Sequence, residues 1–122
     1  MDLVQIENVL NTIRGIVEAL LDKVGDEQGV PNGLDRVAQI DYLSGRKYYS
    51  NDSADKGWKN NPLSASVFPE YVQHSAMALW RLSSAGSHLN NDAIPCTRNT
   101  AIGATHLILD FINWVGHWMD EE

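Results

Sequence analysis

Residues 6–24 read IENVLNTIRGIVEALLDKV, and this stretch carries the most regular hydrophobic pattern of the 122-residue chain. Its apolar residues recur every three or four positions: Ile6, Val9, Leu10, Ile13, Ile16, Val17, Leu20, Leu21 and Val24. At about 100° per residue, these side chains cover an arc of about 140° on a helix. The pattern predicts an amphipathic helix that lies on a core, and Gly25 is expected to end it.

A second helix is predicted after a turn at residues 29–33. Asn32 is placed to cap it, with Asp35 three positions further on. Its expected buried residues are Leu34, Val37, Ile40 and Leu43. The helix should end near Gly45, which leaves a polar loop over residues 46–63 that is long for a small domain.

A third helix is predicted to begin between Ser66 and Pro69, because proline suits the first turn of a helix. Its expected inward residues are Tyr71, Val72, Ala76, Leu79 and Leu82. The helical pattern weakens through residues 83–86, which read SSAG. A linker that contains Pro95 then leads to the last helix.

The fourth helix is expected to run from Thr97 or Asn99 to the end of the chain, and its apolar surface is unusually broad. Its apolar residues are Ile102, Leu107, Ile108, Leu109, Phe111, Ile112, Trp114, Val115, Trp118 and Met119. They cover an arc of about 240°, which exceeds what one face of a small bundle requires. The surplus predicts a homodimer that associates through this helix.

These patterns together predict an all-α fold. The expected architecture is a single domain over residues 1–122, an up-and-down bundle of four main helices with a long loop between helices 2 and 3. Strict alternation of apolar and polar residues does not persist long enough to predict a sheet, and no internal repeat is visible.

Composition and charge narrow the classes of function. With 43% hydrophobic and 20% charged residues the chain is expected to be globular and soluble, and no apolar run approaches a membrane span. The first residues are acidic and unlike a secretory signal, which favours a cytoplasmic location. A formal net charge of −7 argues against non-specific nucleic-acid binding, so any such contact must be local. Cys96 is the only cysteine and can form no internal disulfide.

One local exception to the acidic composition lies in residues 46–59, where basic and aromatic side chains alternate. The candidates for RNA binding are Arg46, Lys47, Tyr48, Tyr49, Lys56, Trp58 and Lys59. Basic groups could bind phosphates while the aromatic rings stack on bases. The same mixture also occurs in solvated loops whose aromatic rings pack back onto the domain.

Few other groups in the chain suggest chemistry. His106, Asp110, Asn113 and His117 form a narrow polar strip on the fourth helix. Such a strip could bind a metal between subunits, but any amphipathic helix also presents one to water, and no metal site or cofactor is predicted. A phosphate-binding glycine loop, a dinucleotide fingerprint and an esterase elbow are all absent from the sequence. His88, Asp92 and nearby serines form no triad that spacing alone would support.

The segment from Arg81 to His88 reads RLSSAGSH, with an arginine and a histidine separated by six residues between two predicted helices. This segment, the apolar helix before it and the long helix after it resemble the C-terminal half of the HEPN superfamily (higher eukaryote and prokaryote nucleotide-binding domains). Members of that family are helical bundles with an arginine, four to six residues and a histidine. The first 60 residues resemble the family only in being helical.

The resemblance implies a metal-independent ribonuclease in which Arg81 and His88 are catalytic and two copies form a composite site. Active members commonly have a polar residue directly after the arginine, where this chain has Leu82. Ser83, Ser84 or Ser87 would have to supply that polar group. The alternative role of the pair is structural, because an arginine late in a helix complements its negative end and a loop histidine can bond exposed carbonyls.

The leading hypothesis is a cytoplasmic, dimeric HEPN-like protein that cleaves RNA, or a relative that has lost this activity, in a prokaryotic toxin or antiphage defence system. The acidic chain would leave room for a separate basic partner or antitoxin. The alternative is a non-catalytic helical module that binds a partner through its fourth helix. No cofactor is expected in either case.

Overall fold

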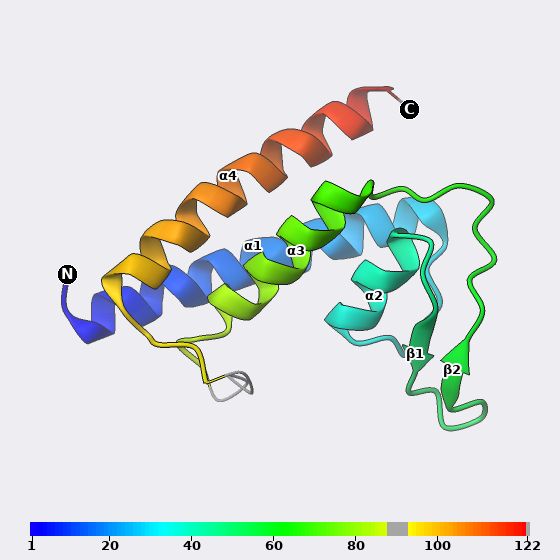
Figure 1. Cartoon of the computed structure of the whole chain (residues 1–122), viewed down its shortest axis with the longest axis horizontal. Coiled ribbons are helices and arrows are strands. Elements are labelled where there is room, and N and C mark those ends of the chain that lie inside the picture. Colours follow the sequence, from blue (N-terminus) through cyan, green and yellow to red (C-terminus); the bar gives the residue numbers. More distant parts are fainter. Residues whose placement is uncertain (88–92, 122) are drawn as a thin grey trace. The chain divides into compact units, whose positions relative to one another are not determined.

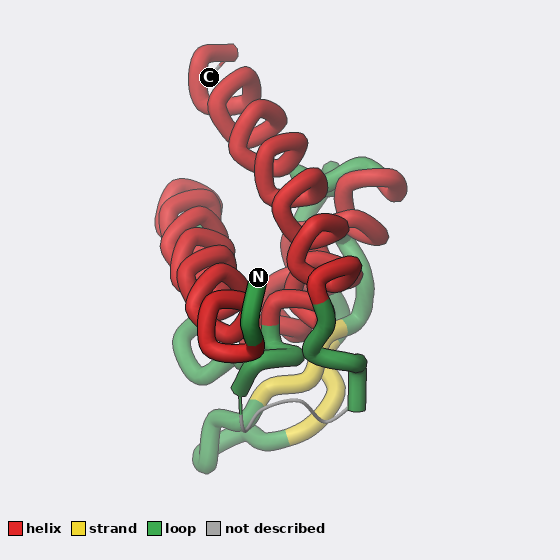
Figure 2. Tube along the Cα trace, turned by 90° about the vertical axis from the view of Figure 1, so that its left-hand side faces the viewer, coloured by secondary structure: helices red, strands yellow, loops and turns green. Residues whose placement is uncertain are grey.

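The computed structural model describes residues 1–87 and 93–121, which form four helices and one short hairpin (Figure 1). The helices are α1 (Leu3–Gln28), α2 (Arg36–Leu43), α3 (Glu70–Ser83) and α4 (Arg98–Glu121). The strands are β1 (Tyr48–Ser50) and β2 (Gly57–Lys59), and both come between α2 and α3 in chain order. Figure 2 shows the strands in yellow. The predicted all-α class, with its loop between the second and third helices, is confirmed.

Helix α1 buries one row of the predicted apolar residues, namely Ile6, Leu10, Ile13, Val17, Leu21 and Val24. The helix does not end at Gly25 as predicted but continues to Gln28. Gly29 has a φ of +66°. The amide of Val30 donates to the carbonyl of Gly25 at 2.9 Å, and the amide of Gly29 donates to the carbonyl of Asp26 at 3.4 Å. This is a Schellman ending, in which the glycine just past the helix takes the left-handed conformation.

Helix α2 is capped by Asp35 and not by Asn32, which corrects the predicted start by three residues. The side chain of Asp35 accepts a hydrogen bond from the amide of Ala38 at 2.8 Å. Ile40 and Leu43 are buried as predicted, whereas Val37 is exposed. The helix ends at Leu43, close to the predicted Gly45.

The predicted long loop contains an antiparallel hairpin in which Tyr49 of β1 faces Trp58 of β2. Beneath it, Tyr42 and Tyr48 pack edge to face with ring centroids 5.0 Å apart. The side chain of Asn61 then ties the returning chain to the end of α2, because its Nδ2 donates to the carbonyls of Tyr42 at 2.9 Å and Arg46 at 2.8 Å. The backbone amide of Leu63 donates to the same side chain at 3.0 Å.

Helix α3 begins directly after Pro69, whose carbonyl accepts from the amides of Val72 and Gln73 at 3.0 Å each. The predicted inward residues Val72, Ala76 and Leu79 are buried. Tyr71 was expected to point inward, but its side chain is 67% exposed. The helix therefore starts one residue after the predicted range, with Pro69 just before its first turn. Tyr71 does not belong to the inward row.

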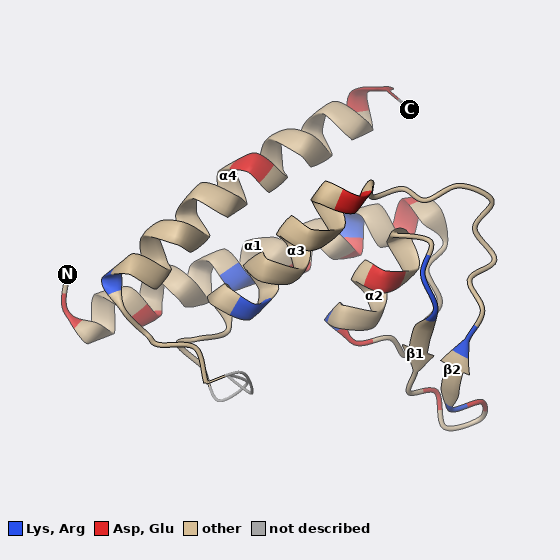
Figure 3. Cartoon of the chain, viewed as in Figure 1, with Lys and Arg blue, Asp and Glu red and all other residues tan. Residues whose placement is uncertain are grey.

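Helix α4 starts after Thr97, whose hydroxyl oxygen accepts from the amide of Thr100 at 3.3 Å. Its buried residues recur every three or four positions: Ala101, Ala104, Ile108, Phe111 and Val115. Charged residues are sparse along this helix (Figure 3). The buried row is narrower than the predicted apolar arc, so other apolar residues of α4 are left exposed.

The chain divides into two compact units. The first unit consists of residues 1–20 and 78–122, and the second unit of residues 21–77. Helices α1 and α3 each contribute residues to both units. The prediction of one domain over the whole chain stays a prediction.

Candidate functional site

Arg81 lies in the last turn of α3 and is exposed, in the first unit. The predicted place of this residue, at the end of a core helix, is therefore correct. A guanidinium in this position complements the partial negative charge of the helix end, and it can also bind a phosphate through paired hydrogen bonds.

The three serines after Arg81 help to end the helix. The hydroxyl groups of Ser83 and Ser84, which are both buried, donate to the carbonyl of Trp80 at 3.2 and 2.8 Å. The hydroxyl of Ser87 donates to the carbonyl of Ser84 at 3.0 Å. The same two carbonyls also accept from backbone amides, that of Trp80 from the amide of Ser84 at 3.2 Å and that of Ser84 from the amide of Ser87 at 3.1 Å, so the hydroxyl groups add to the backbone bonds at this helix end.

The turn that leads toward His88 is held against α1. A Cβ atom built on Gly86 would lie only 3.2 Å from the Cα of Glu7, so a side chain at this position would press closely on the backbone of α1. His88 itself lies outside the described residues. The pairing of Arg81 with His88 therefore stays a prediction, while the chain up to Ser87 is well defined by its contacts.

A second arginine that sequence reasoning missed lies next to this segment. The guanidinium of Arg14 on α1 lies over the ring of Trp80, 5.5 Å from its centroid, and this residue directly precedes Arg81 in the chain. The Nε of Arg14 is buried without a hydrogen bond and lies 3.9 Å from Glu18 Oε1. The sequence signal was only an Arg–Glu pair four residues apart on one helix.

Cys96 lies in the same unit but is a poor nucleophile. Burial of its thiol, and then the negative charge of Glu7, raise the pKa of Cys96 above the ordinary value. The thiolate is the reactive form, so a raised pKa keeps this group protonated and unreactive near neutral pH.

The aromatic candidates for RNA binding lie in the hairpin of the second unit. Tyr49 and Trp58 pack edge to face with ring centroids 5.6 Å apart, and the side chain of Trp58 is 67% exposed. Tyr48, the adjacent residue, is buried against Tyr42. Tyr49 and Trp58 are thus the rings on the outer face of this hairpin, where a base could stack.

The basic candidates of this segment differ in their surroundings. Arg46, Lys47 and Lys56 are exposed. Lys59 donates to a carboxylate oxygen of Asp55 at 2.6 Å, which neutralises part of its charge. The outer rings therefore lie in a segment with a local excess of positive charge, in a chain whose formal net charge is −7.

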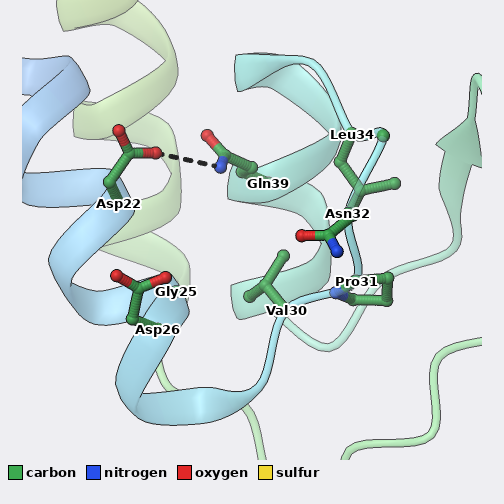
Figure 4. Close-up of a pocket in the computed structure, with 9 residues that line it drawn as sticks. Asp22, Gly25, Asp26, Val30, Pro31, Asn32, Leu34 and Gln39 are labelled. Carbon is green, nitrogen blue, oxygen red and sulfur yellow. Dashed lines mark hydrogen bonds between the residues drawn. The ribbon is translucent and has the colours of Figure 1, made fainter.

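A polar cleft of about 160 Å³ lies where α1 ends and α2 begins, within the second unit (Figure 4). Asp22 and Asp26 of α1 contribute carboxylates to its wall, and Asn32 and Gln39 contribute amides. The hydrogen bond from the Arg36 guanidinium lowers the pKa of Asp22, and Gln39 adds a longer bond of 3.4 Å. This acidic lining disfavours phosphate, so the cleft does not extend the RNA-binding candidates.

No family model, no curated protein and no solved structure matches the chain.

The polar strip of α4 is exposed over all four of its residues, His106, Asp110, Asn113 and His117. Within residues 1–87 and 93–121, no group of three or more His, Cys, Asp or Glu side chains is arranged to hold a metal ion. Over the same residues, none of the helices has the length and hydropathy that a membrane span requires.

Proposed function

We propose that this chain is a HEPN-like ribonuclease that works as a homodimer and cleaves single-stranded RNA without a metal ion. The observation that carries the proposal is the exposed guanidinium of Arg81 in the last turn of α3, seven positions before His88. Its setting is a cytoplasmic prokaryotic toxin or antiphage defence system, in which a basic protein partner or antitoxin restrains the acidic chain.

The proposed reaction uses the RNA itself as the nucleophile. The 2′-hydroxyl loses its proton to a base and attacks the adjacent phosphorus, the bond from phosphorus to the 5′ oxygen breaks, and that oxygen takes up a proton. The products are a 2′,3′-cyclic phosphate and a 5′-hydroxyl. Imidazole groups in general titrate near neutral pH, so we assign the proton transfer to His88, and Arg81 holds the negative phosphate oxygens.

The hairpin supplies the RNA contact in this proposal. The exposed ring of Trp58, supported by Tyr49, offers a surface for base stacking. The exposed side chains of Lys47 and Lys56 offer positive charge to the phosphates. Stacking and charge together favour a single strand, because bases in a duplex are already stacked on each other.

The experiment that tests the proposal is incubation of the purified chain with a labelled single-stranded RNA in EDTA. We expect cleavage with 2′,3′-cyclic phosphate ends, no cleavage of DNA of the same sequence, and a loss of about a hundredfold or more in His88→Ala. His74→Ala is the matched control, because His74 is an exposed histidine of α3 outside the segment from Arg81 to His88. Equal activity of the two variants, or no cleavage by the native protein, would overturn the proposal.

A binding measurement with the same RNA tests the contribution of the hairpin separately from that of the cleavage site. Trp58→Ala should weaken RNA binding by about 1–3 kcal/mol. Tyr71→Ala should leave binding unchanged, and it is a close control because both side chains are 67% exposed and belong to the second unit. Equal affinities of these two variants would remove the hairpin from the RNA contact.

A non-catalytic interaction module is the second candidate function, because α4 exposes large apolar side chains. Ile102, Leu109 and Ile112 are 41%, 55% and 39% exposed. Stable association of this face, in a protein that neither binds nor cleaves RNA, would favour the interaction module over the ribonuclease.

A further inference from the structure

Helix α4 carries a second row of mostly apolar residues, one position further along the chain than the buried row. Its members are Ile102, Thr105, Leu109, Ile112, Gly116 and Met119. They recur at the alternating spacing of three and four residues that is typical of helices packed along one another. Leu109 is 55% exposed, so in a single chain this row faces water. A row of this kind indicates an interface with another helix.

The spacing of this row is the same from either end of the helix. Its spacings are three, four, three, four and three residues, which is symmetric about the midpoint between residues 110 and 111. If two α4 helices lie antiparallel about a two-fold axis at that midpoint, Leu109 faces Ile112 of the second copy. Ile102 then faces Met119, and Thr105 faces Gly116. The spacing is therefore compatible with a two-fold interface, in which one surface contacts the same surface of a second copy.

The charges at the ends of α4 complement the same arrangement. Arg98 lies in the first turn, and Asp120 and Glu121 lie in the last turn. Both placements oppose the helix dipole, which favours acidic residues at the start and basic residues at the end. In an antiparallel pair, each Arg98 lies near Asp120 and Glu121 of the other copy. The unfavourable placement in one chain thus becomes an attraction between two chains.

An apolar groove of about 200 Å³ lies at the start of the row, within the first unit. It is lined by Met1, Val9, Ala101, Ile102, Thr105 and His106. In the antiparallel arrangement, Met119 of the second copy lies opposite Ile102 and therefore at this groove. A methionine side chain is flexible and unbranched, so it suits a groove of irregular shape.

We propose that a second copy of this chain covers this row, with the two α4 helices antiparallel about an axis between residues 110 and 111. The inference rests on the homodimer of the proposed function and names its surface and register. The polar strip of His106, Asp110, Asn113 and His117 lies on another face of α4, about 100° away on the helical wheel. Apart from His106, which borders the groove, that strip stays exposed to water in the dimer.

Sedimentation of the whole chain without RNA tests the surface. We expect the native protein to be a dimer and Leu109→Asp to weaken association by about a hundredfold. Asn113→Asp adds the same charge on the exposed strip and should leave the dimer intact. Both positions are exposed, so both variants should retain native helicity by circular dichroism. A monomeric native protein, or equal association of the two variants, would overturn the proposal.

Crosslinking tests the register. In a Cys96→Ser background, a mixture of Ile102→Cys and Met119→Cys chains should crosslink efficiently with a short thiol-specific reagent, whereas Ile102→Cys alone should not. Crosslinking of Ile102→Cys with itself would show a parallel pair and overturn the register. Arg98→Glu should weaken the dimer, and adding Asp120→Lys and Glu121→Lys to it should restore association. These measurements use no RNA and are independent of the cleavage assay. A dimer without cleavage would overturn the ribonuclease and leave this interface standing, whereas cleavage by a monomer would overturn this interface together with the homodimer and leave the ribonuclease activity standing.

Discussion

The first unit contains most of a 26-residue helix and a 24-residue helix. The second unit contains a helix of eight residues, two strands of three, and the end of α1 and beginning of α3. In α4 a single row of regularly spaced residues is buried. In the second unit, side chains bond segments that are far apart in the sequence, as Asn61 does with Tyr42 and Arg46. Long helices gain enough stability from burying one repeated apolar row, but short elements need specific polar contacts to hold their positions.

The largest expected effect comes from the buried phenylalanine of each unit. Phe111→Ala in the first unit and Phe68→Ala in the second should each lower the free energy of unfolding by about 3–5 kcal/mol, because both side chains are almost fully buried. Urea unfolding followed by circular dichroism measures the change. If the chain is one cooperative domain, both variants shift a single transition.

Tyr71→Ala is the control for these two variants, and it should change stability by less than about 0.5 kcal/mol because its ring is exposed. Two separate transitions, each shifted by only one of the phenylalanine variants, would contradict the prediction of a single domain. The two units would then unfold independently of each other, in addition to being built from different elements.

A smaller effect is expected from the polar contacts of the second unit. Asn61→Ala removes two hydrogen bonds to backbone carbonyls and one from the amide of Leu63, and should cost about 2 kcal/mol. Asn60→Ala changes the adjacent exposed asparagine and should cost less than about 0.5 kcal/mol. Hydrogen exchange of the hairpin amides should rise in the first variant only. Unchanged exchange would mean that apolar packing, and not Asn61, holds this loop.

The smallest effect is a pH-dependent one at Asp22. Its bond with Arg36 lowers the pKa of Asp22 below 3.8 in the folded chain, so the charged form stabilises the fold above the unfolded pKa. This stability is lost as pH falls through the lowered folded pKa. Asp22→Asn should therefore cost about 0.5 kcal/mol at pH 7, since the pair is partly exposed, and almost nothing near pH 2.

Asp26→Asn serves as the comparison for Asp22, since it removes a carboxylate from the same cleft and keeps the bond between Asp22 and Arg36. Thermal unfolding at several pH values would measure both variants. A cost for Asp22→Asn that is equal at pH 7 and at low pH would show that the charge of this group contributes nothing to the fold.

The long helices could be predicted from periodicity, but the positions of their ends could be predicted less accurately. Gly25 and Gly29 are both glycines near the end of α1, but only Gly29 takes a positive φ. The cap of α2 was placed at Asn32 instead of Asp35 because both are good capping residues. The hairpin was missed because strands of three residues are too short for alternation to be visible.

The candidate site was predictable to a similar degree. The position of Arg81 at a helix end follows from the helical pattern before it. The pattern does not show which of Tyr48 and Tyr49 faces outward. Adjacent residues of a strand point to opposite faces, and no strand is predicted at these positions. Arg14 and the cleft at Asp22 depend on side chains from separate segments that meet only in the folded chain.

The four tryptophans give the two units separate optical signals. Trp58 is the one in the second unit and is largely exposed, whereas Trp80, Trp114 and Trp118 belong to the first unit and are partly buried. Trp114 and Trp118 also lie nearly parallel, with ring centroids 6.4 Å apart. Iodide should quench Trp58 more strongly than the other three, so a Trp58→Phe chain would report by fluorescence on the first unit alone.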